Sequence, residues 1–358
     1  MSQSPSAMLS MLAQIEHVLD TIVELGFVYI QNNTIQYSIQ PKLHIYSNNL
    51  RNFELDRWNV TMQYLTDYNF YHSDFDGSYF LCLYDGWREM TEPAEPSQRI
   101  HIPWNSYSDD YKETYLLGVG SVGEPRFYSH LTHTTYVDLP LPVIAYNRHW
   151  NDSNVLLIPD PEFLQTGFES FTHEVSRSDV SYEQKSSQIL WRGARHVNEG
   201  YIYTTEGYEQ DLALLQRNKI HPRDLACAIS QSGGRLVPDV AVFFNASFEY
   251  LPVAEMLTHK YLLDLDGMVS AWSGLYWKLY SNSVVFKLRS HWEQWYYRNM
   301  KPFHHFIPLT NLSPAEIQKA FDWCEILYPE QCKRIAEQAS VFVQQLTYDF
   351  AVKNYTIH

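Results

Sequence analysis

The chain has 358 residues, more than one small hydrophobic core usually holds, so its length predicts two domains. Its composition, 45% hydrophobic and 19% charged, is typical of a water-soluble globular protein. The formal net charge of −15 argues against a nucleic-acid-binding protein, because such proteins hold phosphates through Lys and Arg. A nucleotide ligand stays open, since it needs only a local positive site.

Cysteine spacing and apolar runs bear on the compartment of the protein. The cysteines are scattered, form no C-x-x-C pair, and lie at Cys82, Cys227, Cys324 and Cys332. This spacing favours free, mostly buried thiols in a reducing compartment over a disulfide framework or a zinc site. The N-terminal segment lacks the basic and apolar parts of a signal peptide, and no stretch approaches the roughly 20 apolar residues of a membrane span. We therefore expect a cytoplasmic protein with at most peripheral membrane contact.

The first half of the sequence predicts a helix followed by short strands. Apolar residues at helical spacing over 8–26 predict an amphipathic helix that Gly26 ends, and the section to about residue 70 predicts short runs and polar turns. Buried strands are expected at 79–84, 141–146 and 155–158. Asp85 follows the first of these strands, where open α/β sheets hold their ligands. An equally good interpretation is that Asp85 caps the following turn.

A glycine pattern at 118–123, G-V-G-S-V-G, matches the dinucleotide-binding fingerprint G-x-G-x-x-G. Glu124 and Pro125 follow where a helix should begin, and no clean strand of a βαβ unit precedes the pattern. We therefore interpret these residues as a glycine-rich loop.

The stretch 254–308 carries the clearest pattern for a ligand site. Its expected elements are a buried strand at 262–265, a glycine turn at Gly267, a helix beginning near Trp272 and a buried strand at 284–286. Asp264 and Asp266 flank the carboxyl end of the first strand, and Ser270 and Ser273 offer N-caps to the helix. A strand that leads through glycine and serine into a helix N-terminus is an arrangement that binds phosphate groups.

Other segments of the second half predict the elements around this stretch. They are a strand at 189–191, a helix at 225–229, a helix at 292–302, a strand or extended segment at 306–309, a helix from Pro314 with a capping box at Ser313 and Glu316, and a helix or helix pair over 335–351. Arg192 and Arg195 flank Gly193 and suit a bidentate contact with an oxyanion, although a surface salt bridge explains W-R-G-A-R equally well. His304 and His305 are adjacent, and no Asp/Glu/His cluster has ligand spacing, so no metal site is expected. The absence of G-x-S-x-G argues against a serine hydrolase.

Motifs of the second half occur together in the order typical of one family. They are W-R-G-A-R (191–195), H-K-Y-L-L-D-L-D-G (259–267), A-W-S-G (271–274), S-N-S-V-V-F-K (281–287) and W-Y-Y-R-N-M-K-P-F-H-H-F-I-P (295–308). In this combination the chain resembles glycosyltransferase family 90 over about residues 185–345. That family includes protein O-glucosyltransferases, capsule xylosyltransferases and bacterial lipopolysaccharide glycosyltransferases. In the first half, V-I-A-Y-N-R (143–148) and the strand before Asp85 fall where family members have comparable elements.

The resemblance implies an α/β fold of GT-B architecture, in which two Rossmann-like domains face each other across a cleft. The domains it implies are 1–178, which carries the base, 179–338, which binds the nucleotide sugar, and 339–358, a C-terminal helix that packs back on the first domain. The boundary falls in a polar, poorly periodic run over 169–185.

The resemblance also implies inverting transfer from a UDP-sugar, with no metal or other cofactor. Asp85 corresponds to the carboxylate that deprotonates the acceptor hydroxyl, and Arg192 to the arginine that contacts the diphosphate. The residues it places at the nucleotide sugar are Arg192, Gly193, Arg195, Asp266, Gly267, Met268, Val269, Ser270, Ala271, Trp272, Ser273 and Lys278. Asp264 and Asp266 are expected to cap the loop or hold the ribose and neighbouring backbone.

One position departs from the family pattern. Leu275 stands two residues after Ser273, where many members carry an arginine that contacts the diphosphate, and Lys278 can substitute as a point charge. Our first hypothesis is a UDP-sugar-dependent transferase that moves a glucose- or xylose-type sugar to a glycan or lipid-linked saccharide, in lipopolysaccharide or other surface polysaccharide synthesis. The second hypothesis keeps the enzyme class but makes a protein Ser or Thr the acceptor. The third is a non-catalytic member that binds a nucleotide or a partner, and Leu275 is the feature that favours it.

Overall fold

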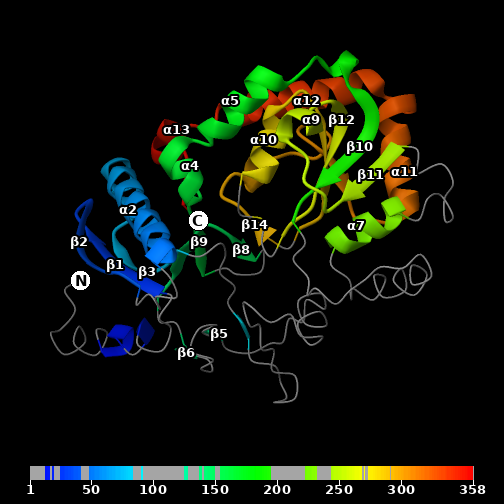
Figure 1. Cartoon of the computed structure of the whole chain (residues 1–358). Coiled ribbons are helices and arrows are strands. Elements are labelled where there is room, and N and C mark those ends of the chain that lie inside the picture. Colours follow the sequence, from blue (N-terminus) through cyan, green and yellow to red (C-terminus); the bar gives the residue numbers. More distant parts are fainter. Residues whose placement is uncertain are drawn as a thin grey trace, which may run out of the picture.

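Two five-stranded sheets, each covered by helices, form the centre of the computed structural model (Figure 1). The structure describes residues 13–16, 18–19, 25–41, 48–83, 90–91, 125–127, 137–138, 141–149, 154–194, 222–231, 243–267, 270, 273–290 and 292–357. Both sheets contain parallel strands, so the predicted α/β class is confirmed.

The first sheet is mixed, with the strand order β2-β1-β3-β7-β9. Its strands are β1 (Leu25–Gln31), β2 (Thr34–Ile39), β3 (Gly77–Cys82), β7 (Val143–Ala145) and β9 (Val155–Leu157). β1 is antiparallel to β2 and β3, whereas β3, β7 and β9 run parallel. The three strands predicted from apolar runs are therefore confirmed: β3 begins and ends two residues earlier than expected, and β7 and β9 are shorter than expected. The prediction that Gly26 ends a helix is wrong, because Gly26 lies inside β1, where a side chain would meet the ring of Trp58.

The helix α2 (Asn48–Tyr71) covers one face of this sheet, where the sequence predicted short strands and turns. Alternate strand residues, such as Val28 and Leu81, pack against Tyr64 and Leu65 of α2. The other face packs against Ile15, Val18 and Leu19 of the N-terminal segment. Neither α2 nor any other helix in the described part of the chain is long and apolar enough to cross a membrane.

The second sheet is parallel throughout, with the order β11-β10-β12-β13-β15. Its strands are β10 (Ser186–Arg192), β11 (Phe244–Ser247), β12 (His259–Asp264), β13 (Val284–Leu288) and β15 (Ile307–Leu309). All but β11 were predicted as short apolar runs. Continuous apolar runs are typical of interior parallel strands, which are buried on both faces.

Helices cover both faces of the second sheet. They are α5 (Glu169–Ser178), α7 (Pro222–Gln231), α9 (Val253–Met256), α10 (Gly274–Tyr280), α11 (Pro314–Asp322) and α12 (Pro329–Gln344), with a π-helical turn at Trp323–Leu327. Two further helices, α4 (Pro161–Thr166) and α13 (Tyr348–Lys353), pack against α2 instead. The expected capping box is half formed, because Ser313 accepts from the Glu316 N–H while the Glu316 carboxylate accepts from Thr310. The expected helix at 292–302 is wrong. That segment forms the short strand β14 (Trp292–Glu293) and a single 3-10 turn at Tyr297–Asn299.

Three further short strands form a separate antiparallel sheet in the described residues. They are β4 (Met90–Thr91), β5 (Pro125–Phe127) and β6 (Val137–Asp138). The glycine pattern at 118–123 lies outside the described residues.

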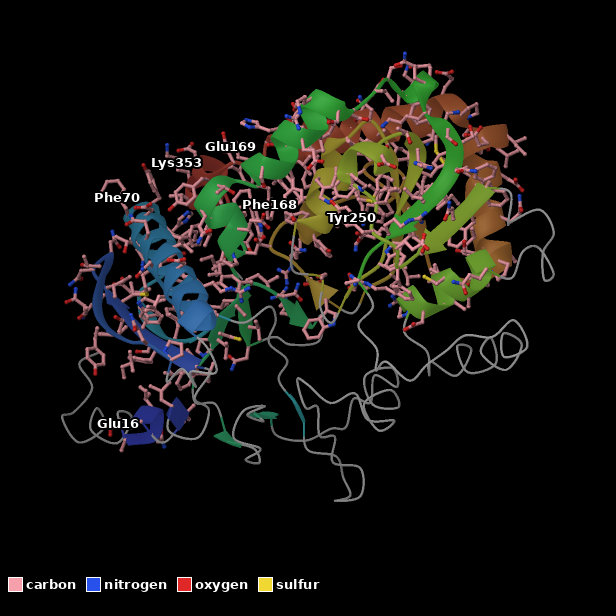
Figure 2. The ribbon with its side chains drawn as sticks, viewed as in Figure 1. Glu16, Phe70, Phe168, Glu169, Tyr250 and Lys353 are labelled. Carbon is pink, nitrogen blue, oxygen red and sulfur yellow. A yellow bond between two sulfur atoms is a disulfide. The ribbon has the colours of Figure 1, made fainter. Side chains whose placement is uncertain are left out.

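One hydrophobic cluster joins the two sheets. It includes Ile144 of the first sheet and Val285 of the second, together with Tyr276 of α10. Phe168, at the junction of α4 and α5, points inward and packs its ring 4.8 Å from that of Tyr276, whereas its neighbour Glu169 points outward (Figure 2). The polar run at 169–185, where the domain boundary was expected, thus contains a helix that packs on α9 and α10.

The last helix, α13, packs on α2 of the first half (Figure 1). The hydroxyl of Tyr64 donates to the carbonyl of Ala351, and the hydroxyl of Tyr348 donates to Asp67. Beyond the helix, the hydroxyl of Tyr355 donates to the carbonyl of Leu157 in β9. The chain end is therefore tied to the first sheet and its helix, and the division into 1–178, 179–338 and 339–358 stays a prediction.

Cys324 and Cys332 form a disulfide, with Cα atoms 5.4 Å apart. The prediction of free thiols is wrong for this pair and holds for Cys82 and Cys227, which are buried thiols. The chain turns back between the π-helical turn and α12, which brings together two positions eight residues apart. Spacing alone gave no sign of this turn, and the inference of a reducing compartment loses the support of these two residues.

Asp160, the N-cap of α4, supplies a test of the packing between the sheets. Its Oδ1 accepts from the Phe163 N–H, its Oδ2 is buried without a partner, and burial raises the pKa of Asp160 to about 7. The folded state then keeps a proton that the unfolded chain releases above about pH 4, so the free energy of unfolding falls as the pH rises from 4 through 7. Asp160→Asn keeps the cap without the charge, so at pH 8 it should stabilise the fold by on the order of 1–3 kcal/mol. Urea unfolding at pH 5 and 8 measures this.

The gain from Asp160→Asn should be clearly smaller at pH 5, where the wild-type carboxyl is protonated. Asp74→Asn, at an exposed position before β3, serves as the control and should show no such pH dependence. A gain that is the same at both pH values would contradict a buried, proton-binding Asp160.

Candidate functional site

The candidate site lies at the carboxyl edge of the second sheet, where β10 and β12 end. Leu190 pairs with Leu262 in the parallel ladder, so Arg192 lies level with Asp264 two residues further along. The chain leaves β12 through Asp266 and Gly267 and enters α10 at Gly274. The sequence-predicted arginine and the predicted loop therefore share one edge of one sheet.

Asp264 is the electrostatic centre of this edge. Its side chain is buried, and its oxygens accept from Nζ of Lys278 at 2.9 Å and from Nζ of Lys287 at 3.2 Å. Burial alone would raise the pKa of Asp264, but the two ammonium groups hold it well below its usual range. Asp264 is thus a permanent anion between two buried cations, which leaves this group of three with a net positive charge.

Asp266 is held by residues from other segments. Its carboxylate accepts from the hydroxyl of Ser290, and its backbone carbonyl accepts from Nε of Arg223 at 2.9 Å. Arg223, on α7, also donates to the carbonyl of Ala194 at 2.8 Å and so joins the ends of β10 and β12. Burial raises the pKa of Asp266 and Asp264 adds to the rise, while Lys287 opposes it.

Arg192 is the last residue of β10, and only part of its guanidinium is hydrogen-bonded. Nη1 donates to the carbonyl of Trp191 at 2.8 Å and to that of Asn245 at 3.3 Å, while Nε and Nη2 have no partner in the described part of the chain. Burial lowers the pKa of Arg192, which still leaves a cation at neutral pH. The next position is a glycine, Gly193, because a side chain there would come within 2.7 Å of the buried Trp191 ring.

Ser270 ties the loop to the first half of the chain. Its hydroxyl accepts from Nδ2 of Asn147 at 2.8 Å, and its carbonyl accepts from Nε2 of Gln294. The amide oxygens of Asn147 and Gln294 are both buried and have no hydrogen-bond partner. Beside them, Arg148 donates to Glu293 at 2.9 Å, and β8 (Arg148–His149) pairs with β14. The loop is therefore held from both sheets, with two acceptor oxygens left over.

The helix after the loop begins at Gly274, two residues later than predicted. Ser273 occupies the N-cap position, but its side chain makes no capping bond; burial raises the pKa of Glu162, and the side chain of Ser273 opposes that rise. A side chain at Gly274 would meet no atom of the described residues within 4 Å. Leu275, where an arginine was expected, is 3% exposed and packs in the cluster that joins the two sheets.

The structure describes part of the predicted site and brings that part together. It places Arg192, Gly193, Asp266, Gly267, Ser270, Ser273 and Lys278 at one edge of the sheet. The remaining predicted site residues, Asp85, Arg195, Met268, Val269, Ala271 and Trp272, lie outside the described residues. Among the residues that are described, no group of three or more His, Cys, Asp or Glu could hold a metal ion.

Sequence reasoning missed Asn147, Arg223, Lys287 and Gln294. Each lies outside the loop, Lys287 on the next strand and the others in more distant segments, so the spacing within the loop did not point to them. Two of them had a usable signal, because Lys287 ends a predicted buried strand and Asn147 follows another. A polar residue at the carboxyl end of an interior parallel strand is the pattern that could have identified both.

The arrangement can bind an anion without further cations. Arg192, Arg223, Lys278 and Lys287 bring four positive charges to the edge, against the carboxylates of Asp264 and Asp266. The two unpaired amide oxygens add acceptors that suit the hydroxyl or N–H groups of a ligand. An anionic group with hydroxyls attached therefore fits the chemistry of this edge.

Comparisons with known proteins bear on the same part of the chain. The profile of glycosyl transferase family 90 matches residues 125–358, which include every strand of the second sheet. A curated protein named O-glucosyltransferase LpsA, from Dichelobacter nodosus, is 23% identical over 256 residues, 71% of each chain. The family match begins after Asp85, so it carries no information on that residue.

The lysine–aspartate group supplies a test of the site's packing. Asp264→Asn leaves two buried ammonium groups without their shared carboxylate, and breaking a buried pair in this way typically costs about 3–5 kcal/mol. We expect a loss of that order in the free energy of unfolding, measured by urea denaturation. Asp349→Asn removes one partner of the exposed pair with Lys353 and should leave the unfolding midpoint nearly unchanged. Equal effects of the two substitutions would contradict the electrostatic role of Asp264.

Proposed function

The chain belongs to glycosyl transferase family 90, and we propose that it transfers a glucose-type sugar from a UDP-sugar to a hydroxyl acceptor with inversion at C1. Family membership makes it a glycosyltransferase. The name of the relative, O-glucosyltransferase, supports glucose as the sugar and oxygen as the accepting atom. A surface polysaccharide such as lipopolysaccharide is the acceptor class we propose, and the alternative is a protein Ser or Thr.

The observation that carries the donor site is the convergence of cations on one loop. In this proposal the diphosphate of UDP lies against residues 266–273, where Arg192 still has unpaired donors. Lys278 is paired with Asp264. In this proposal it attracts the phosphates through the net positive charge that Lys278, Lys287 and Asp264 carry together. None of the described residues lies within 4 Å of a side chain placed at Gly274, so none of them stands in the way of the phosphates at this turn.

The proposed reaction is a single displacement. Asp85 takes the proton from the acceptor hydroxyl, the acceptor oxygen forms a bond to C1 of the sugar, and the bond from C1 to the UDP oxygen breaks. The leaving UDP gains negative charge, which Arg192 and the cationic edge stabilise in place of a metal ion. The arrangement we propose around this step is the GT-B one, with Asp85 of 1–178 across a cleft from the donor held by 179–338 and the C-terminal segment 339–358 packed on the first domain.

Leu275 favours a second candidate function, in which the protein binds a nucleotide but catalyses no transfer. Its burial means that no charged group stands at this position toward the loop. Binding and turnover measured separately distinguish the two candidates.

Binding of UDP tests the donor site. Arg192→Ala should weaken UDP binding about 10- to 100-fold, because charge-assisted hydrogen bonds are worth roughly 1.5–3 kcal/mol. Isothermal titration calorimetry measures the dissociation constant. Arg177→Ala, on the last turn of α5, removes the same side chain away from the site and should bind like wild type. Equal UDP affinity in wild type and Arg192→Ala would remove Arg192 from the donor site.

Turnover tests the proposed base. Asp85→Asn should lower UDP-glucose hydrolysis or transfer by about 10²–10⁴-fold, the usual contribution of a general base, while UDP still binds. Release of UDP, followed with a coupled assay, measures this rate. Asp74→Asn controls for the loss of a carboxylate elsewhere in the first half. Wild type that binds UDP but releases none from a panel of UDP-sugars would favour the non-catalytic candidate.

A further inference from the structure

A groove with a volume of about 850 Å³ lies away from the sheet edge described above. The turn segment 298–305 forms one wall and the helices α12 and α13 form the other. None of the donor-site residues that the structure describes lines it. In Figure 1, α12 and α13 run along the top of the molecule, while the arrows of β10 and β11 point to the opposite side.

The turn wall of the groove is basic. Arg298, Lys301 and His304 line it, and in the described part of the chain none of these side chains has a carboxylate partner. Glu337 is the one carboxylate among the lining residues that the structure describes. In a chain with a formal net charge of −15, unpaired basic groups that share a groove make a local site for an anion.

His305 forms the floor of the groove as a neutral ring. It is 7% exposed, stacks on Phe342 with ring centroids 4.5 Å apart, and accepts the Lys301 N–H at Nδ1 over 3.1 Å. Burial, followed by the charges of His304 and Lys301, lowers the pKa of His305 to about 4. A neutral imidazole that accepts at Nδ1 carries its proton on Nε2, so this ring adds a hydrogen-bond donor that does not depend on pH near neutrality.

The helix wall combines apolar and amide side chains. Its apolar members include Val341, 56% exposed, and the partly buried Phe342 and Phe350. Its amides are Gln338, Gln345 and Asn354, and Asn299 adds an amide from the turn wall. Apolar and aromatic surface suits the C–H faces of a sugar ring, and carboxamides suit its hydroxyls. The volume lies within the roughly 300–1,000 Å³ typical of small-ligand sites.

The turn that carries the basic residues has a fixed and unusual backbone. Phe303 has a φ of 57°, a left-handed conformation that bulky residues rarely adopt. Its N–H donates to the Phe306 carbonyl at 2.7 Å, and its ring lies 5.4 Å from that of Trp323. Such conformations persist where surrounding contacts hold them, often at ligand sites. The turn therefore presents its basic side chains on a preformed backbone.

We propose that this groove binds a saccharide that carries a phosphate group, at a second site apart from the donor site. Arg298 and Lys301 hold the phosphate, Nε2 of His305 donates to an oxygen, and the amides and Phe342 hold the sugar ring. Inorganic phosphate would make only the contacts with Arg298 and Lys301. An uncharged sugar would make only those with the amides and Phe342. The proposal requires no transferase activity, since it concerns binding on another face of the protein.

Calorimetry and saturation-transfer NMR with glucose 6-phosphate test this site, with saturating UDP present to occupy the donor site. Wild type should bind the sugar phosphate at least fivefold more tightly than inorganic phosphate and should not bind glucose detectably. The double variant Arg298→Gln/Lys301→Gln should lose at least tenfold in affinity. Arg334→Gln, on α12 outside the groove, should bind like wild type.

Three results would overturn the proposal. The first is no binding of glucose 6-phosphate by wild type, or equal affinity in the double variant. The second is inorganic phosphate binding as tightly as the sugar phosphate, which would remove the saccharide. The third is binding to phosphatidylglycerol vesicles but to no sugar phosphate, which would make the ligand a membrane surface. If the double variant does not fold, the single variant Lys301→Gln is tested in its place. Its unfolding midpoint is measured to show that it is folded.

Discussion

The carboxylate of Asp264 is the interaction on which the carboxyl edge of the second sheet depends. It ends the central strand β12, and its two lysine partners come from the helix and the strand that follow the loop. Two buried ammonium groups would repel each other without it, since desolvated charges are costly unless paired. The same carboxylate therefore fixes where α10 and β13 stand relative to β12. The two ends of the loop are held in this way, and none of the described residues comes within 4 Å of a side chain placed at Gly274.

The middle of the loop depends on the first sheet instead. Asn147, just beyond β7, donates to Ser270, and Arg148 pairs with Glu293 close by. These polar contacts lie at the edge of the hydrophobic cluster that joins the two sheets. A loop held by two sheets is sensitive to their relative position, because a small shift of either one changes the hydrogen bonds at Ser270. The geometry of the site is thus a property of both halves of the chain.

The fold could be predicted from sequence where burial leaves a local pattern. Continuous apolar runs identified β3, β7, β9 and four strands of the parallel sheet, because interior strands are apolar on both faces. α2 was missed because its buried apolar side chains are mostly aromatic, such as Trp58 and Tyr64, and stand among Asn, Asp and Thr rather than in an aliphatic stripe. The aromatic run at 292–302 suggested a helix, yet its large rings are buried by contacts with separate elements, as when Trp295 packs on Phe163.

The candidate site could also be predicted only in part, where its residues belong to local sequence motifs. Arg192, Asp266 and Ser270 could be placed because they follow predicted strands within short motifs. The partners that hold them, Asn147, Arg223 and Gln294, could not, because each comes from a segment distant in sequence and meets the loop only through the fold. The disulfide was missed for the same reason, since only the turn before α12 brings its cysteines together.

Leu275 shows how a departure from a family motif can depend on packing. The inner face of α10 is part of the cluster between the sheets, and position 275 lies on that face beside Tyr276 and Leu279. An arginine with the same orientation would be a buried charge without a partner, which is costly, or would require the helix to turn. The cations of this edge instead come from Lys278, one turn further along α10, and from Lys287 on the next strand, and Asp264 makes their burial tolerable. A leucine at 275 and a lysine pair around Asp264 therefore belong together: one face of α10 packs in the core, while Lys278 of α10 and Lys287 of the next strand supply the charge.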